Sequence, residues 1–395
     1  MGAHAILNLI YLDAHATTPC DPAVVEAMQP YFAEAFGNAA SRHHAFGWRA
    51  REAVDAARAE IAALIGAHHK DILFTSGATE SNNLALKGVA EGLGLRAEGG
   101  RHIVSVATEH RSVLDSCAAL EARGVRVTRL PVQPDGLLVL DDLQAAIASD
   151  TVMVSVMAAN NEIGVLQPLA EIGAVCRERG VLFHTDAAQA VGKIPIDVDR
   201  MQIDLLSCTA HKIYGPKGIG ALYVRRQAKS ALAAQMHGGG HERGLRSGTL
   251  NVPGIVGFGK ACAISRSKMG EESEHLRLLR DRLLAGLEAA IADLQVNGSM
   301  EKRLPHNLHV SIPGIEGSAL FLALDDIAVS PGAACTTASA EPSHVLAALS
   351  VNEDLGRASI RFGLTRFTTA EEIEYVISRL AGLVPHLRAR QAALR

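Results

Sequence analysis

Residues 181–186 (VLFHTD) and residues 205–212 (LLSCTAHK) decide the fold of this chain. Each stretch begins with apolar residues and ends with polar ones, Asp186 in the first and Lys212 in the second. Short apolar runs that alternate with helical stretches indicate a mostly parallel sheet covered by helices. In such folds ligands bind beyond the carboxyl ends of the strands. Asp186 and Lys212 are therefore expected at the edge of the sheet where a ligand binds.

The same alternation extends along most of the chain. Further strands are expected at residues 72–75, 102–106, 125–130, 151–157 and 220–224, and helices at residues 49–65, 114–123, 140–148 and 169–179. After about residue 260 the pattern changes to a long charged helix at 272–294 and then to mixed strands and helices. The prediction is an α/β fold with a large cofactor-binding domain, residues 17–262, and a smaller α+β domain, residues 1–16 and 263–395.

The composition is that of an ordinary globular enzyme, with 395 residues, of which 48% are hydrophobic and 20% are charged. The formal net charge of −4 argues against a nucleic-acid partner bound through a broad basic surface. No apolar run approaches the roughly 20 residues that span a bilayer, so no membrane partner is expected. Residues 1–11 lack a basic segment and a signal-peptide cleavage pattern. We therefore expect a cytoplasmic protein.

The cysteines and histidines do not form a metal-binding pattern. The six cysteines are scattered without a C-x-x-C pair, and each is by default a small buried hydrophobe. The 17 histidines include the adjacent pairs His43-His44 and His68-His69, whose side chains point in different directions, and there is no H-E-x-x-H motif. We expect no metal site.

Lys212 and Asp186 together favour one kind of cofactor. A lysine at the end of a strand can form a Schiff base with an aldehyde, although most lysines are solvated surface residues. An aspartate beside it could pair with the pyridine nitrogen of pyridoxal phosphate and make the ring an electron sink. Asp186 alone is also compatible with a helix cap or a loop carboxylate.

A phosphate site is predicted where a strand runs into a helix at residues 75–80. Gly77-Ala78-Thr79 offers backbone N–H groups, a hydroxyl and the positive end of a helix dipole, although a plain helix cap is the alternative. Thr209 and His211 add donors just before the lysine. No G-x-G-x-x-G or Walker motif is present, which disfavours a nucleotide cofactor. His110 follows a strand and is compatible with stacking on a cofactor ring and moving protons, or with a polar loop.

Taken in order along the chain, these motifs resemble those of the cysteine desulfurases. The matching segments are YLD at 11–13, ATTP at 16–19, TSGATESNN at 75–83, TEH at 108–110, NNEIG at 160–164, HKIYGPKG at 211–218, HGGGHERG at 237–244, RSGT at 246–249 and ACT at 334–336. The resemblance is closest to the NifS/IscS-like group, group I, of the class V aminotransferase family. It runs from Tyr11 to about Leu380 and implies the pyridoxal-phosphate fold type I.

The resemblance implies a role for each matching residue. Lys212 carries the cofactor and later moves protons, Asp186 pairs with the pyridine nitrogen, and His110 stacks on the ring and acts as acid and base. The remaining implied roles are Gln189 as donor to the ring hydroxyl, Ala78, Thr79, Thr209 and His211 as phosphate ligands, Thr249 as a ligand of the partner subunit's phosphate in a homodimer, and Asn161 and Arg361 as ligands of the substrate carboxylate.

Cys335 lies in SPGAACTTAS, residues 330–339, where small residues predict a mobile loop of about residues 330–343. No cationic residue adjoins it, so the sequence does not show what favours its thiolate. The resemblance implies that Cys335 takes the sulfur of L-cysteine as a persulfide while L-alanine is released. It also implies transfer to an iron–sulfur scaffold or another sulfur acceptor, with Cys335 contacting an iron–sulfur cluster during transfer.

Three features depart from the family pattern. His15 stands where a small residue is usual, and Pro331 and Ala333 replace serines. The chain ends at Arg395, whereas housekeeping members that it resembles continue into a tail that docks the scaffold. These departures leave the acceptor open more than the chemistry.

Two other functions are compatible with parts of this pattern. The first is a different reaction on the same cofactor, such as that of an aminotransferase or a selenocysteine lyase, because a shared fold does not fix the reaction. Cys335 argues against transamination, which does not need it. The second is a non-catalytic sulfur-relay subunit, which would not require Lys212, Asp186, His110 and Cys335 together.

Overall fold

The computed structural model describes residues 9–94, 101–331 and 342–393. Its centre is a seven-stranded sheet with the order β2-β8-β7-β6-β5-β3-β4. The strands are β2 (Ile72–Thr75), β3 (His102–Val106), β4 (Arg126–Leu130), β5 (Thr151–Ser155), β6 (Leu182–Asp186), β7 (Leu205–Thr209) and β8 (Gly220–Val224). β8 runs antiparallel to both of its neighbours, and the other neighbouring strands pair in parallel. The predicted mostly parallel sheet is confirmed.

Alternate residues of these strands enter two separate cores. Phe74, Val104 and Leu206 belong to the core on one face, whereas their neighbours Leu73, Ile103 and Leu205 belong to the core on the other. Because successive side chains of a strand point to opposite faces, both faces of this sheet are covered, and the central strands are apolar throughout. That is why these strands read as continuous apolar runs in the sequence.

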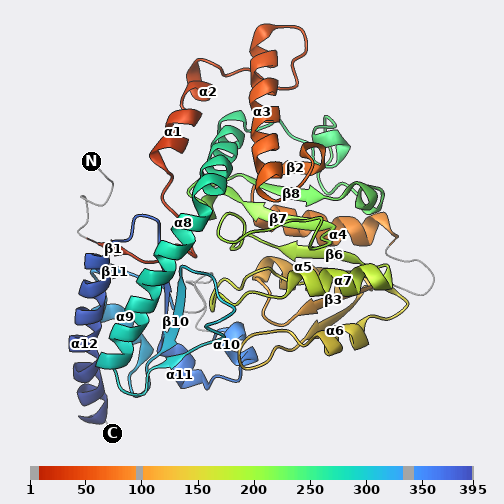
Figure 1. Ribbon diagram of the computed structural model, residues 1–395. Coiled ribbons are helices and arrows are strands. Elements are labelled where there is room, and N and C mark those ends of the chain that lie inside the picture. Colours follow the sequence, from red (N-terminus) through yellow and green to blue (C-terminus); the bar gives the residue numbers. More distant parts are fainter. Residues whose placement is uncertain (1–8, 95–100, 332–341, 394–395) are drawn as a thin grey trace.

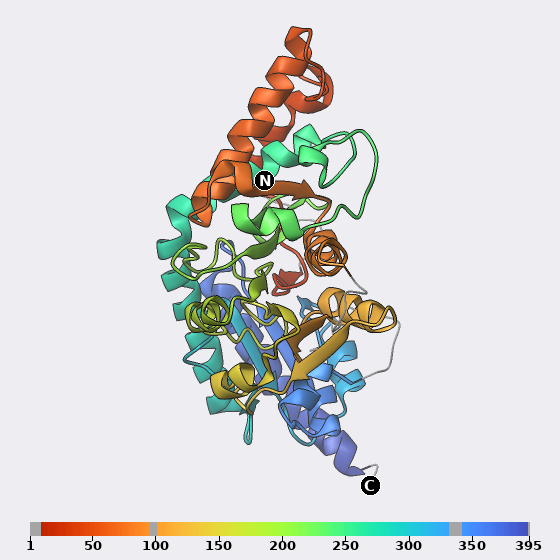
Figure 2. The same cartoon turned by 90° about the vertical axis from the view of Figure 1, so that its right-hand side faces the viewer.

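Helices cover the sheet on both sides. α4 (Ala78–Gly92) and α5 (Arg111–Glu121) pack on one face. α3 (Ala45–Leu64), α7 (Leu169–Arg179) and the first part of α8 (Val252–Ala290) contribute to the core on the other face, and α6 (Leu140–Ala146) joins them through the buried Leu143 and its partly buried apolar ends. α1 (Pro22–Met28), α2 (Pro30–Ala33) and the start of α3 project from one end of the molecule (Figures 1 and 2).

The smaller unit is built on a three-stranded antiparallel sheet, β12-β10-β9. Its elements are β9 (Gln295–Val296), β10 (Asn307–Ser311), α9 (Gly317–Ala323), β11 (Ile327–Ala328), α10 (His344–Ala348), α11 (Glu353–Arg357), β12 (Ser359–Gly363) and α12 (Ala370–Ala393). The N-terminal strand β1 (Ile10–Tyr11) pairs in parallel with β11, which brings residues near the N-terminus to this unit. Helices and an antiparallel sheet together confirm the predicted smaller α+β fold.

α8 connects the two units as one continuous helix (Figure 1). The expected helix at 272–294 is therefore wrong at both ends, because the helix already begins at Val252 and ends at Ala290. Glycine is unfavourable inside a helix. A Cβ on Gly259 would lie 2.6 Å from the Ala57 backbone of α3, however, so glycine lets the two helices pack closely. The proposed boundary between residues 262 and 263 falls inside this helix and stays a prediction.

Candidate active site

A cavity of about 620 Å³ lies at the carboxyl ends of the central strands. Ten of the twelve site residues predicted from the sequence line it: Ala78, Thr79, His110, Asn161, Asp186, Gln189, Thr209, His211, Lys212 and Arg361. Thr249 is exposed and lies outside this lining. Cys335 falls within residues 332–341, outside the described residues.

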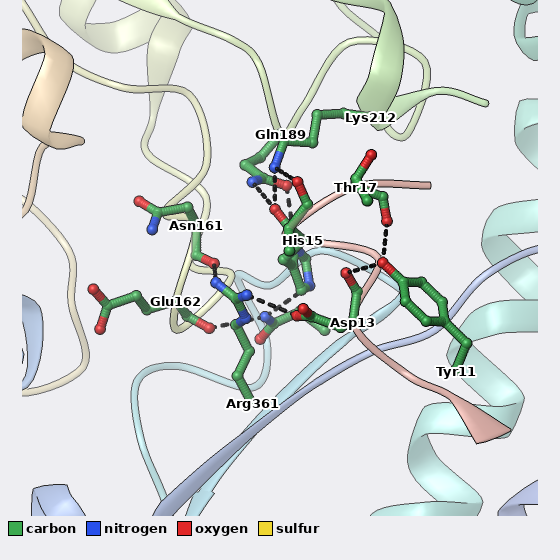
Figure 3. A network of polar contacts seen from close by, with 11 residues as sticks. Tyr11, Asp13, His15, Thr17, Asn161, Glu162, Gln189, Lys212 and Arg361 are labelled. Atoms are coloured by element: carbon green, nitrogen blue, oxygen red, sulfur yellow. Dashed lines mark hydrogen bonds and ion pairs between the residues drawn. The ribbon is translucent and has the colours of Figure 1, made fainter. Parts of the chain in front are cut away.

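Lys212 reaches the cavity from a single 3₁₀ turn, Ala210–Lys212, that follows β7. Its Nζ donates to the carbonyl oxygen of Ala16 at 2.8 Å and to that of His15 (Figure 3). Both acceptors belong to the segment that follows β1. The N-terminal segment of the chain therefore positions the lysine ammonium group at the cavity wall.

Tyr214 fixes the backbone just beyond Lys212. It is fully buried and has a φ of 65°, a left-handed conformation that is uncommon for a large side chain. The backbone N–H of Tyr214 donates to the Thr18 hydroxyl at 2.8 Å, and the Tyr214 hydroxyl accepts from the backbone N–H of Arg366 at 2.7 Å. The Arg366 guanidinium lies over the ring, 3.8 Å from its centre. These contacts hold a strained backbone in place two residues from the lysine.

Asp186 ends β6 and is linked to His110 by two polar side chains. Its carboxylate accepts from Asn82 Nδ2 at 2.6 Å and from the Ala188 N–H at 2.9 Å. The same Asn82 nitrogen donates to Ser112 Oγ at 2.8 Å, and Ser112 Oγ lies 2.8 Å from His110 Nδ1. The Ser112 N–H also donates to His110 Nδ1 at 3.2 Å. Nδ1 is therefore an acceptor, and the ring proton of neutral His110 sits on Nε2.

Glu109 is a second carboxyl group behind this wall. It is buried, and one oxygen accepts from the Met157 N–H at 2.6 Å. Burial, and then the nearby negative charge of Asp186, raise the pKa of Glu109 well above its usual value. Burial therefore favours the neutral form of Glu109, whereas Asp186 and Glu80 are the carboxylates that line the cavity itself.

The opposite end of the cavity is suited to an anion. α4 begins at Ala78 directly after β2, so its first backbone N–H groups and its dipole face this end, beside Thr209 and His211. A Cβ on Gly220 would lie 2.6 Å from the Gly77 Cα, so glycine lets β8 pass close behind the start of the helix. Burial lowers the pKa of His211 to about 4, with Lys212 and Lys217 adding to the effect. His211 is therefore a neutral hydrogen-bonding group.

Arg361 enters the cavity from β12 and is only 1% exposed. Nη2 pairs with Asp13 Oδ1 at 2.8 Å, and Nη1 donates to the Asn161 carbonyl oxygen at 2.9 Å (Figure 3). The buried Nε has no hydrogen-bond partner within the described parts of the chain. A buried cation with spare donor capacity at a cavity wall is suited to a carboxylate ligand.

Both described flanks of residues 332–341 contact this wall. The Ser330 carbonyl oxygen accepts a hydrogen bond from the backbone N–H of Arg361 at 2.9 Å. On the other side, the Ser343 hydroxyl donates to the carboxyl group of Glu162. Burial raises the pKa of Glu162 to about 7, opposed by the Ser343 hydrogen bond and by Arg361. The chain that carries Cys335 therefore leaves and rejoins the described structure beside Arg361 and Glu162.

The described residues offer neither a metal-binding cluster nor a membrane-spanning helix. No group of three or more histidine, cysteine, aspartate or glutamate side chains within residues 9–94, 101–331 and 342–393 is arranged to hold a metal ion. Within the same ranges no helix is long and apolar enough to cross a membrane.

Comparison with known proteins identifies the family. The model of the class-V aminotransferases matches residues 10–376, which is most of the chain. The chain belongs to the class-V aminotransferase family. A curated relative from Anaeromyxobacter sp. (strain Fw109-5), "Cysteine desulfurase IscS", is 57% identical over 379 residues, 96% of this chain and 93% of that protein. The protein of the same name from Methylococcus capsulatus is 55% identical over the same shares.

Two solved structures resemble this class-V chain closely. A "NifS-like protein" has a TM-score of 0.89 and 36% identity, and the match covers 96% of this chain and 100% of the other. The structure titled "SspA in complex with cysteine" has a TM-score of 0.80 and 36% identity, with 91% and 100% covered. The predicted NifS/IscS-like resemblance and the pyridoxal-phosphate fold type I are confirmed.

The cofactor of this class-V enzyme is pyridoxal phosphate, and the cavity fits it. The cofactor has a phosphate, a pyridine nitrogen and an aldehyde carbon. The start of α4 offers donors for the phosphate, Asp186 is an anion for the nitrogen, and Lys212 is an amine for the aldehyde. The predicted cofactor is confirmed.

Sequence reasoning missed the residues behind the cavity wall, Asn82, Ser112 and Glu109. One signal for Asn82 was present. It shares the buried face of α4 with Leu86 and Val89, four and seven residues later, where an amide must find partners. Glu109 lies in the TEH segment at 108–110 but was given no role there, and Ser112 gave no comparable signal.

Proposed function

We propose that this chain is a cysteine desulfurase, which converts L-cysteine to L-alanine and holds the sulfur as a persulfide on Cys335. The observation that carries the proposal is that the cofactor site and the two ends of the segment with Cys335 lie at the same cavity. The cavity with Lys212, Asp186 and Arg361 is also where the flanks of the Cys335 segment, Ser330 and Ser343, are anchored. The relatives named cysteine desulfurase, which align with 96% of this chain, support the same reaction.

The large sheet would hold the cofactor. In this proposal Lys212 carries it covalently, Asp186 keeps the pyridine nitrogen protonated, and Gln189 donates to the ring hydroxyl. The proposed phosphate ligands are Ala78, Thr79, Thr209 and His211, with Thr249 reaching the phosphate of the partner subunit. Bound pyridoxal phosphate supplies an electron sink for the substrate's α-carbon.

The remaining residues would bind and convert L-cysteine. Arg361 and Asn161 bind its carboxylate. Lys212 and His110 move the protons, and the Nδ1 contacts of His110 direct its Nε2 proton away from Ser112. The Cys335 thiolate attacks the substrate sulfur, so that a new S–S bond forms while the substrate's C–S bond breaks. The carbon skeleton takes up a proton and leaves as alanine.

The test uses the purified holoenzyme with L-cysteine. Parent protein should release alanine and carry persulfide, and borohydride should fix the cofactor to Lys212. Cys335→Ala should keep the cofactor and release no alanine. Normal alanine release by Cys335→Ala would overturn the proposed role of Cys335, and fixation to another lysine would overturn the site.

We also propose a homodimer. Four large aromatic side chains, Phe32, Phe36, Phe46 and Trp48, are between 50% and 66% exposed on the projecting α2–α3 region (Figure 1). Apolar area of this kind on one projection is typical of a surface that another protein covers. A second copy there would also fit the proposed reach of Thr249, which is exposed. The molecular mass in solution tests this proposal.

An iron–sulfur scaffold or another sulfur-acceptor protein is the proposed destination of the sulfur, with Cys335 contacting an iron–sulfur cluster during transfer. We propose a cytoplasmic location, in which the five described cysteines, all free thiols, would stay reduced. Transfer of labelled sulfur from the loaded enzyme to a purified scaffold tests the acceptor.

A further inference from the structure

His15 occupies an unusual place for a histidine. It is 1% exposed, yet it lines the cavity between Lys212 and Arg361 (Figure 3). Its ring stacks on His306, with ring centres 4.6 Å apart and planes at 25°. On another side its Cδ2 lies against Gly363, where an added Cβ would come within 2.8 Å. The plane of the His15 ring is therefore fixed by packing.

The hydrogen bonds of Asn307 decide which nitrogen of His15 carries the proton. Asn307 Oδ1 accepts from the Arg303 guanidinium at 2.9 Å, and Asn307 Nδ2 donates to the Glu162 carbonyl oxygen at 3.0 Å. Because a guanidinium can only donate and a carbonyl can only accept, the amide cannot be flipped. Asn307 Nδ2 therefore donates to His15 Nε2 at 2.9 Å, and the proton of His15 is on Nδ1.

Gln189 leads independently to the same tautomer. Its Nε2 lies 3.0 Å from the His15 carbonyl oxygen, so this atom is the donor and the other amide atom is Oε1. Oε1 lies 3.1 Å from His15 Nδ1, which must therefore donate to it. Burial, and then the nearby charges of Arg361, Lys212 and Lys193, lower the pKa of His15 well below its usual value, so this neutral tautomer persists.

His15 thus contacts both ends of the Gln189 amide. The backbone carbonyl oxygen of His15 accepts from Gln189 Nε2, and the His15 ring N–H donates to Gln189 Oε1. The amide nitrogen has a second N–H, and the described residues supply no other acceptor for it. We propose that His15 is a positioning residue, which fixes the Gln189 amide so that this N–H faces the ring hydroxyl oxygen of pyridoxal phosphate. This inference rests on the proposed function and adds a residue to its site.

The expected signature is spectroscopic. In the deprotonated form of the Lys212-bound cofactor, the ring oxygen carries its full negative charge. A hydrogen-bond donor to that oxygen therefore favours the deprotonated form. Losing the donor should raise the pH midpoint of the cofactor's visible absorption band. We expect His15→Leu, similar in size but without a donor, to raise the midpoint by about 0.5–1 pH unit. His15→Asn, whose Nδ2 can replace the lost donor, should stay near the parent value.

A double substitution separates positioning from a direct effect of the histidine. Gln189→Leu should raise the midpoint at least as much as His15→Leu, and adding His15→Leu to it should cause no further shift. If His15→Leu fails to fold, His15→Ala, which also lacks a side-chain donor, replaces it in the same comparison. An unchanged midpoint in His15→Leu, or additive shifts in the double variant, would overturn this inference but leave the proposed function intact. A parent protein without any Lys212-bound band would overturn the proposed function and this inference with it.

Discussion

The two walls of the cavity are built in different ways. The wall that contains Asp186 and His110 comes from strand ends and helix starts of one sheet, and neutral side chains, Asn82 and Ser112, link its parts. The wall around Arg361 brings together segments near residues 13, 161, 330 and 343, and it depends on the partly buried ion pair between Arg361 and Asp13. The first wall is therefore built from short local motifs, whereas the second is built from contacts between segments that are far apart in the sequence.

The difference has an electrostatic consequence. On the first wall, burial favours the neutral form of Glu109, and Asp186 and Glu80 are the carboxylates that line the cavity. On the second wall, Arg361 is paired with Asp13 while Glu162 sits nearby with a pKa of about 7. Changes to the second wall should therefore alter substrate binding and the pH dependence of stability, whereas changes to the first should alter cofactor binding and proton transfer.

The largest effect is expected at Arg361. Arg361→Lys keeps the charge but loses the planar fork that serves Asp13, Asn161 and a carboxylate together. We expect kcat/KM for L-cysteine to fall at least about 100-fold, about 3 kcal/mol, with cofactor content unchanged. Arg379→Lys on α12, which pairs with the distant Asp326, is the matched control. Equal loss of cofactor and activity would mean that Arg361 supports the fold rather than the substrate.

Glu162 should make stability fall as pH rises. Its pKa is about 7 in the folded chain against an ordinary 4.5, so the folded state binds the extra proton between these values. The penalty is absent below about pH 4.5 and fully present above about pH 7, where it reaches about 3 kcal/mol. Glu162→Gln should therefore unfold at a higher temperature than the parent at pH 8, and the two should converge near pH 5.

The control for this prediction is Glu301→Gln, at an exposed position. Thermal unfolding at the two pH values is measured for all three proteins. A gain from Glu162→Gln that is equal at pH 5 and pH 8 would contradict a titration of Glu162 and would indicate a packing effect instead.

Asn82 tests the first wall. Asn82→Leu removes the donor to Asp186 and leaves that carboxylate less well held behind the cavity. We expect cofactor affinity to fall about 10–100-fold, which corresponds to about 1–3 kcal/mol. Equilibrium dialysis of pyridoxal phosphate measures it. Asn83→Leu, next on α4, removes a hydrogen bond within the helix, to the Thr79 carbonyl oxygen, and should change affinity little.

The same contrast explains what could be predicted from the sequence. Strand ends and helix starts are local, so the sequence pattern alone places Lys212, Asp186 and the start of α4 on the same edge of the sheet. The apolar runs located the strands because both sheet faces are buried. The apolar runs located the ends of the strands less well, because β6 continues through Asp186 and β7 through Thr209, where polar residues still pair in the sheet.

Contacts between distant segments could not be predicted in this way. The sequence gives no distance between Asp13 and Arg361, which are 348 positions apart, yet they form a partly buried ion pair. His15 was noticed only as an unusual residue, because its partners Gln189 and Asn307 lie 174 and 292 positions away. The start of α8 was missed in a stretch where glycine, locally unfavourable in a helix, permits close packing against α3.

The smallest effect is expected at Ser112, the link between Asn82 and His110. Its hydroxyl accepts from Asn82 and donates to His110 Nδ1, but its backbone N–H also donates to Nδ1 at 3.2 Å. Ser112→Ala therefore weakens the hold on the ring without freeing it. We expect kcat for alanine release to fall about threefold to tenfold, about 1 kcal/mol, with KM for L-cysteine unchanged, because the proposed ligands of the substrate carboxylate, Arg361 and Asn161, are on the other wall. Ser116→Ala, one turn later on α5, removes a hydroxyl that donates to the Ser112 carbonyl oxygen at 2.7 Å and is the control. If Ser112→Ala raised KM as much as it lowered kcat, the two walls would be coupled, and the division between cofactor wall and substrate wall would be wrong.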